Sequence, residues 1–167
     1  MTPMTDVGFV QMRISQVVGL SNGDRISEFV VLDEPGGDRQ LLIQIGQVEA
    51  FALAANLGEM EWGRPMTYQF MLQLVRSLGG RIREVRLDGL VEGAYAATVE
   101  VDGPQGVELG DARSSDALDL AALTAPPILV GLEVLEDCDR RREGDSCEAT
   151  LLRRALDARA MTFARTA

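Results

Sequence analysis

Hydrophobic and polar residues alternate along the first part of the chain, and this pattern predicts β-strands. Apolar positions recur at every second residue over 7–18, and the runs 26–34 and 39–46 are rich in valine, leucine and isoleucine. The polar, glycine-containing segments 21–24 and 35–38 are typical of turns. We therefore expect three strands joined by short turns into an antiparallel meander.

The period of the pattern changes after Gly46 and predicts two helices. The first covers 47–58, with Gly58 as its C-terminal cap. The second begins near Thr67, a candidate N-cap, and stops at Gly79-Gly80. Each helix has apolar residues on one face, which are Val48, Phe51, Ala52 and Ala55 in the first and Phe70, Met71, Leu74, Val75 and Leu78 in the second.

The following residues return to the period of a strand. Segment 84–103 predicts a hairpin whose second strand alternates Tyr95, Ala97, Val99 and Val101, and 105–112 predicts one more strand. A third helix over 115–124 is ended by Pro126-Pro127, and 128–130 is a short buried strand. This order of three strands, two helices, three strands, one helix and one strand predicts an α+β fold, with a mixed or antiparallel sheet and about three core helices.

The chain of 167 residues has the size of one domain. Its composition shifts after Glu136, where 137–150 is polar and punctuated by glycine, and 151–164 has the pattern of an amphipathic helix. We therefore expect an α+β domain over 1–136, followed over 137–167 by a polar linker and a C-terminal helical appendage. The appendage is a candidate for binding a partner or a second copy.

Composition excludes several kinds of chemistry. The chain has no histidine, and all of its 16 basic residues are arginines. A Ser-His-Asp triad, a histidine metal site, a Schiff-base lysine and a P-loop are therefore excluded. The net charge of −10 disfavours long-range attraction to nucleic acid.

Arginines nevertheless cluster locally. Arg76, Arg81, Arg83 and Arg86 lie close together, as do Arg140 to Arg142, and each group is either a basic patch or, as we favour, a solvated surface. No apolar run is long enough to span a bilayer, and the first residues lack the pattern of a signal peptide. We expect a cytoplasmic protein with no membrane partner, whose cysteines Cys138 and Cys147 are free thiols.

Polar residues crowd the entrance of the third helix. Asp111 ends a strand, Asp116 lies in the first helical turn, and Arg113 stands between them. A serine N-cap (Ser114 or Ser115) and an acidic first turn stabilise a helix without any function. Alternatively, the carboxylates of Asp111 and Asp116, with Glu49 as a third, converge on a divalent cation such as Mg²⁺ or Mn²⁺, and Arg113 binds a phosphate or carboxylate.

Three stretches together resemble the bifunctional nuclease (BFN) domain family. They are Ile43-x-Ile45-Gly46-x-x-Glu49-Ala50, Arg64-Pro65-x-Thr67 and Asp111-x-Arg113-x-Ser115-Asp116-Ala117, and the resemblance covers about residues 7 to 136. It implies an α+β fold with a mixed sheet, homo-oligomers, and cleavage of DNA and RNA by some members. It also implies a site in which Asp111, Arg113, Ser115 and Asp116 are catalytic and Arg64, Thr67 and Arg113 bind substrate.

The chain departs from the family pattern at two places. The family usually has His-Asp after Arg-Pro-x-Thr, where this chain has Tyr68-Gln69, and proline where this chain has Ser114. The first departure removes the most natural general base and ligand pair from the polar cluster.

Three hypotheses follow from the sequence. The first is a metal-assisted phosphodiester hydrolase with Glu49, Asp111 and Asp116 as ligands and with Arg64 and Arg113 on the phosphate. The second is a BFN-like domain repurposed as a small-molecule enzyme or as a regulatory protein that binds an anionic ligand. The third is a structural oligomer whose cluster closes on itself, Arg113 pairing with Asp111 or Asp116, and Arg64 with Glu49.

Overall fold

A computed structural model describes residues 8–22, 24–58, 61–143, 153 and 161–165. Within these residues the strands are β1 (Phe9–Asn22), β2 (Arg25–Asp33), β3 (Gln40–Ile45), β4 (Arg81–Val91), β5 (Ala94–Gly103), β6 (Gly106–Arg113), β7 (Ile128–Gly131) and β8 (Met161–Arg165). The helices are α1 (Gln47–Leu57), α2 (Thr67–Ser77), α3 (Ser114–Thr124) and α4 (Leu132–Glu143). The predicted α+β class and the order of elements through β7 are confirmed.

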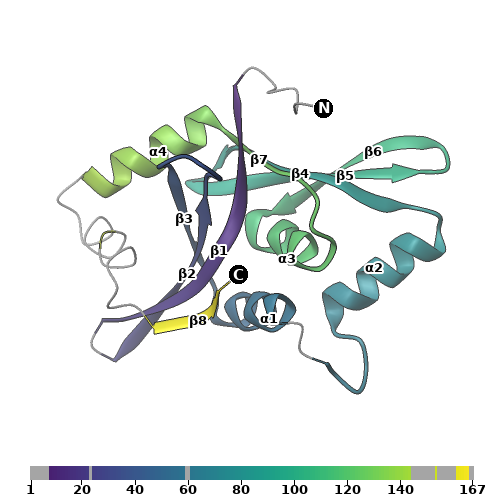
Figure 1. Ribbon diagram of the computed structural model, residues 1–167, viewed down its shortest axis with the longest axis horizontal. Helices are drawn as coiled ribbons and strands as arrows, with labels where there is room; N and C mark the ends of the chain where they lie inside the picture. Colours follow the sequence, from purple (N-terminus) through teal and green to yellow (C-terminus); the bar gives the residue numbers. More distant parts are fainter. Residues whose placement is uncertain (1–7, 23, 59–60, 144–152, 154–160, 166–167) are drawn as a thin grey trace.

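The strands form one mixed sheet in the order β3-β2-β1-β7-β4-β5-β6, and β8 pairs with β1 (Figure 1). The neighbours pair antiparallel, except that β7 lies parallel to β4. Segments 9–45 and 81–113 therefore build two antiparallel halves, and the four-residue strand β7 joins them through β1 and β4. As a result, α3 and β7 lie near the middle of the molecule.

The hydrophobic core fills the space between the sheet and its helices. Helix α3 packs against α1 and against β4 and β5, whereas α4 packs against β3, β4 and β7. Side chains with no exposed surface come from every layer, as Val30 of β2, Leu53 of α1, Leu87 of β4 and Leu118 of α3 illustrate. The position of α3 is therefore fixed by close packing against the sheet and α1.

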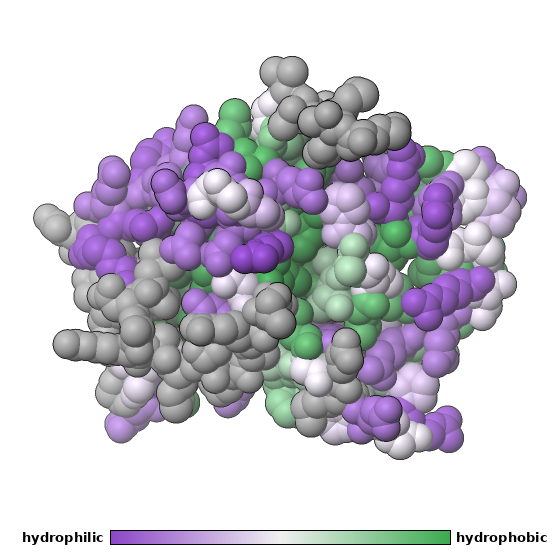
Figure 2. Space-filling view, viewed as in Figure 1, coloured by the Kyte–Doolittle hydropathy of each residue, from purple (hydrophilic) through white to green (hydrophobic). Residues whose placement is uncertain are grey.

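The predicted apolar faces of the first two helices agree only in part with the faces that the protein buries. In α1 the predicted Ala55 is buried together with Ala50 and Leu53, whereas the predicted Val48 and Phe51 are exposed. In α2 only Leu72 is buried. Since α2 packs by a narrow edge, its predicted face of Phe70, Met71, Leu74 and Leu78 remains exposed. In Figure 2 hydrophobic residues are exposed between hydrophilic ones on the half of the molecule that carries α2 and the β5–β6 hairpin.

Two predicted helix caps are wrong. The N-cap of α2 is Met66, so Thr67 is the first helical residue. The N-cap of α3 is Arg113, and both Ser114 and Ser115 lie inside the helix without a side-chain cap bond. Strand β6 runs directly into α3 here, so no separate capping residue stands between them.

The C-terminal region also differs from the prediction. Helix α4 continues through the expected boundary at 136/137 and buries Cys138, a free thiol, in the core. Residues 137–143 are therefore helix rather than linker. The predicted helix over 151–164 lies mostly outside the described residues, and its end belongs to strand β8. None of the helices in the described part of the chain is long and apolar enough to cross a bilayer.

Candidate functional site

The guanidinium of Arg113 holds together side chains from α1 and α3. Its Nε and Nη2 donate to the two carboxylate oxygens of Asp116, at 2.7 and 2.8 Å. Its Nη1 donates to Glu49 Oε1 at 3.0 Å. The hydroxyl of Tyr68, from α2, donates to Asp116 Oδ1 at 2.7 Å. We call these four residues the arginine cluster.

Local structure explains why these residues meet. Asp116 lies three residues after Arg113, so the turn from β6 into α3 brings the two side chains together. On α1, Glu49 lies in the first turn, and its Oε2 would be 2.3 Å from a Cβ at Gly46. Only glycine at position 46 therefore leaves room for the Glu49 carboxylate to fold back over the start of α1.

The protonation states within the cluster follow from these bonds. The Arg113 hydrogen bonds hold the pKa of Asp116 below its ordinary value, and Asp116 in turn raises the pKa of Arg113. Burial, together with the bond to Asp116, raises the pKa of the Tyr68 hydroxyl. At neutral pH the cluster therefore contains an ionised carboxylate, a guanidinium and a neutral phenol that donates.

Tyr68 is the member of the arginine cluster that the sequence did not predict. It stands where the family pattern usually has histidine, and that substitution suggested the loss of a side chain from the cluster. The structure instead brings the Tyr68 hydroxyl onto Asp116. A phenol supplies a hydrogen-bond donor but no cation at neutral pH, so Tyr68 contacts Asp116 without offering the acid–base chemistry of an imidazole. Its place directly after the Arg64-Pro65-x-Thr67 motif was the available signal.

A second carboxylate lies one turn further along α3. Asp119 has no exposed surface, and its Oδ1 accepts a hydrogen bond from Asn56 Nδ2 of α1 at 2.8 Å. Its Oδ2 is buried with no partner among the described residues. Burial, with smaller contributions from the negative charges of Asp116 and Glu49, raises the pKa of Asp119 to about 7. Asp119 therefore carries a proton over much of the range below neutral pH.

A pocket of about 370 Å³ opens beside the arginine cluster. Its lining includes Glu49, Asp111, Arg113, Ser114 and Ser115. The two serines are buried, and their hydroxyls have no hydrogen-bond partner among the described residues. The Asp111 side chain is exposed and likewise forms no hydrogen bond or ion pair in the described part of the chain. The pocket thus joins a guanidinium, an unpaired carboxylate and the N-terminus of a helix.

Two predicted substrate-binding residues lie elsewhere. Arg64 lines a different pocket, formed by the loop before α2 and by α2 itself. Thr67 is exposed at the start of α2 and lines neither pocket. The predicted pairing of Arg64 with Glu49 is wrong, because Glu49 binds Arg113; the pairing of Arg113 with Asp116 is confirmed.

The residues expected to hold a divalent cation do not fit one as they are arranged. No three histidine, cysteine, aspartate or glutamate side chains of the described residues gather as metal ligands. Asp116 and Glu49 both direct oxygens to Arg113, which neutralises the charge that a cation would need. We therefore derive no chemical step through a metal.

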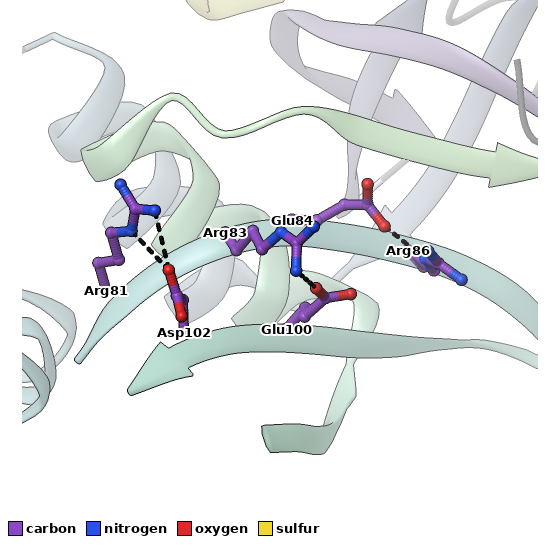
Figure 3. A network of polar contacts seen from close by, with 6 residues as sticks. All are labelled: Arg81, Arg83, Glu84, Arg86, Glu100 and Asp102. Atoms are coloured by element: carbon purple, nitrogen blue, oxygen red, sulfur yellow. Dashed lines mark hydrogen bonds and ion pairs between the residues drawn. The ribbon is translucent and has the colours of Figure 1, made fainter. Parts of the chain in front are cut away.

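The arginines of β4 do not form a free basic patch. Arg81 pairs with Asp102 at 2.8 Å and Arg83 with Glu100 at 2.9 Å, while Arg86 bonds to Glu84 (Figure 3). The second group, Arg140 to Arg142, is likewise paired with Asp137 and Asp139 of α4. Apart from Arg76, the described arginines of both groups are therefore ion-paired rather than free for a ligand, and Arg86, Arg141 and Arg142 are less exposed than a solvated surface would make them.

Comparisons with known proteins identify the family of the chain. The sequence model of the bifunctional nuclease domain matches residues 30–143, a range that contains the whole arginine cluster. Two proteins of Mycobacterium tuberculosis, both described only as uncharacterized, are 37% identical to the chain over 106 residues. One is from strain CDC 1551 / Oshkosh and the other from strain ATCC 25618 / H37Rv. The matched region spans 64% of this chain and 63% of either relative.

Proposed function

Because the chain belongs to the bifunctional nuclease domain family, we propose that it cleaves phosphodiester bonds of nucleic acid in the pocket where β6 meets α3. The observation that supports this proposal most is the composition of the pocket. It places the largely exposed guanidinium of Arg113 beside the unpaired carboxylate of Asp111. Hydrolysis of a phosphodiester requires at least a cation that stabilises the negative charge on the phosphate and a group that accepts the proton of the attacking water.

Each residue of the pocket has a role in the proposed reaction. Arg113 binds the non-bridging phosphate oxygens, for which a planar guanidinium is well suited. The backbone N–H groups at the start of α3 and the hydroxyl of Ser115 add donors for the same anion. Water attacks phosphorus, Asp111 accepts the proton of that water, and the bond to the leaving oxygen breaks as the oxygen takes a proton from solvent.

The remaining members of the arginine cluster position Arg113. Asp116 accepts two hydrogen bonds from it, and Tyr68 restrains the Asp116 carboxylate by donating to Oδ1. Glu49 attaches the same guanidinium to α1. A phosphate that reaches Arg113 exchanges with Glu49, whose single bond is easier to replace than the pair from Asp116.

A second candidate function is binding of an anionic ligand without cleavage. It is favoured by one observation, which is that Arg113 already has carboxylate partners on two sides. In such a site the anion would displace Glu49 and alter the contact between α1 and α3, which a regulatory protein can use.

Cleavage of labelled single- and double-stranded DNA and of RNA by the pure protein tests the proposal. The assay is run with Mg²⁺, with Mn²⁺ and with EDTA, so that a metal requirement is measured separately. Asp111→Asn and Arg113→Gln are expected to lower the rate at least about 100-fold. Asp38→Asn and Arg25→Gln, at exposed positions of the β2–β3 turn and of β2, are matched controls that keep the wild-type rate.

Two results would decide against cleavage. Equal rates in the wild type and in Asp111→Asn would assign the activity to a contaminant or to another site. Binding of the same nucleic acids without any cleavage would select the second candidate function.

We also propose that the chain self-associates through the exposed apolar face of α2. Phe70, Met71, Leu74 and Leu78 form this face, and Phe51 of α1 is exposed as well. Monomeric proteins rarely leave a contiguous apolar surface of this kind in water. A second copy is the occupant we propose, because the resemblance to the family implies homo-oligomers.

A further inference from the structure

The pocket that contains Arg64 has a composition that the proposed cleavage site does not explain. It has a volume of about 480 Å³ and lies between the loop 61–66 and α2. Its polar lining consists of one acidic residue, two arginines, two glutamines and a tryptophan, which are Glu61, Arg64, Arg76, Gln69, Gln73 and Trp62. It shares no lining residue with the pocket beside Arg113. We call it the Trp62 pocket.

Unmatched positive charge is the first unusual property of the Trp62 pocket. Arg64 and Arg76 form no ion pair or hydrogen bond among the described residues. By contrast, the arginines of β4 and α4 all have acidic partners, as described above. The lining has two guanidiniums and only one carboxylate, that of Glu61, which forms no ion pair with either arginine among the described residues. In a chain with 26 acidic residues and 16 arginines, this local excess of positive charge points to an anionic ligand.

The aromatic side chain is the second property. Trp62 is the only tryptophan of the chain, and its ring centroid lies 6.1 Å from that of Phe51 at an interplanar angle of 59°. This contact with α1 restrains the indole while the residue stays partly exposed at the pocket. A restrained indole that lines the same pocket as two guanidiniums suits a planar ring, because aromatic bases stack on such side chains at a gain of about 1–3 kcal/mol per base.

The glutamines supply the third property. Gln69, Gln73 and Arg76 follow one another at helical spacing, so they share one flank of α2. Gln69 uses its Oε1 to accept from the backbone N–H of Met66 at 3.0 Å, so its amide group is held in place. The side-chain amide of Gln73 forms no hydrogen bond among the described residues. A free amide offers both a donor and an acceptor to the edge of a base.

From these three properties we infer that the Trp62 pocket binds a nucleotide. Its base stacks on Trp62 and meets the amide of Gln73, and its phosphate lies between Arg64 and Arg76. The volume falls within the range of about 300–1,000 Å³ that is usual for small-ligand pockets. The same chemistry is offered by a free mononucleotide and by one nucleotide of a single strand. The inference does not depend on cleavage at Arg113, because the two pockets are separate.

Helix α2 separates this pocket from the proposed self-association face. The pocket residues Gln69, Gln73 and Arg76 lie on one flank, and Phe70 and Leu74 are centred about a third of a turn away on the neighbouring flank. The polar groups that we assign to the nucleotide therefore do not belong to the apolar face.

Intrinsic fluorescence tests the inference directly, since Trp62 is the only indole. Adenosine monophosphate is titrated into the full chain, with adenosine and inorganic phosphate as separate arms and a short single-stranded oligonucleotide as a fourth. We expect saturable quenching by the mononucleotide or the oligonucleotide, and at least about tenfold weaker binding of adenosine or phosphate alone. Binding of the oligonucleotide alone would identify the ligand as a unit of a strand.

The variant Arg76→Gln tests the role of the Arg76 guanidinium in nucleotide binding, and Arg25→Gln is its control. Both arginines are exposed and unpaired among the described residues, so neither change is expected to affect folding, which circular dichroism verifies. Arg76→Gln should weaken nucleotide binding at least about tenfold and Arg25→Gln should not change it. Absence of quenching in every arm, or equal affinity in the wild type and Arg76→Gln, would overturn the inference.

Discussion

The buried carboxyl of Asp119 makes stability depend on pH in a range where few other groups titrate. In the folded protein its pKa is raised to about 7 from an ordinary value of 3.8. The folded state therefore binds more protons than the unfolded state between these two values. The free energy of unfolding must fall as pH rises from about 4 to 7, by roughly 2–4 kcal/mol, and level off above.

Urea unfolding of the wild type and of Asp119→Asn at pH 5 and pH 8 measures this effect. The variant should lose the decrease, because an amide does not ionise. Between pH 5 and pH 8 the free energy of unfolding should therefore fall less in Asp119→Asn than in the wild type. Since the chain has no histidine, Asp119 is expected to dominate this window. Asp38→Asn, at an exposed aspartate, is the control that retains the slope. Equal slopes in all three proteins would mean that Asp119 ionises freely when folded.

The hydroxyl of Tyr68 contributes to stability through a single bond. Tyr68→Phe removes the 2.7 Å hydrogen bond to Asp116 and leaves the packing of the ring. We expect the free energy of unfolding to fall by about 1–2 kcal/mol, as for other bonds to a charged acceptor. Tyr95→Phe is a useful comparison, because its bond to Asp137 is longer at 3.3 Å and should contribute less. A double-mutant cycle with Asp116→Asn isolates the Tyr68 bond, and additive losses would contradict its assignment.

At the scale of single residues, contacts between neighbours in the sequence are easier to predict than contacts between residues far apart in it. One hypothesis from the sequence paired Arg113 with Asp111 or Asp116, and the structure has the pair with Asp116, which the strand-to-helix turn brings close. The partner of Glu49 could not be predicted, because it depends on how α1 packs against α3. The same packing creates the bond between Asn56 and Asp119, whose residues are 63 positions apart.

At the scale of elements, the helical period locates a helix but does not decide which flank is buried. The apolar residues of α2 were predicted as one face, and the structure leaves most of them exposed because α2 packs through Leu72. The end of the core was also misjudged. The polar run 137–143 continues α4, since Cys138 is buried while the arginines that follow it are ion-paired at the surface.

The exposed face of α2 leads to a prediction about assembly. Leu74→Glu places a charge at the centre of this face and should convert the oligomer to a monomer, as measured by sedimentation equilibrium. A stable interface buries at least about 1,000 Å², so exposed residues of α1 are expected to take part. Leu109→Glu, at an exposed leucine of β6, is the matched control and should leave the mass unchanged. A monomeric wild type would contradict self-association through α2.

At the scale of the whole molecule, net charge and local charge act in opposite directions. The chain carries a net charge of −10, so it repels a nucleic acid at a distance. Most arginines of the described residues are neutralised by neighbours, as Figure 3 illustrates for β4. Arg64, Arg76 and Arg113 line the two pockets and are the cations available to phosphate there. Binding should therefore involve few phosphates.

The dependence of binding on salt measures that number. For single strands the logarithm of the association constant falls by about 0.7 per neutralised phosphate for each unit in the logarithm of salt concentration. Three contacts predict a slope of about −2, and Arg76→Gln should make it shallower by about 0.7, whereas Arg25→Gln should not. Fluorescence anisotropy of a labelled oligonucleotide over a series of salt concentrations gives the slope. A slope steeper than about −4 would require more cations than the two pockets supply, and the arginines of β4 or α4 would then have to exchange their acidic partners for phosphate.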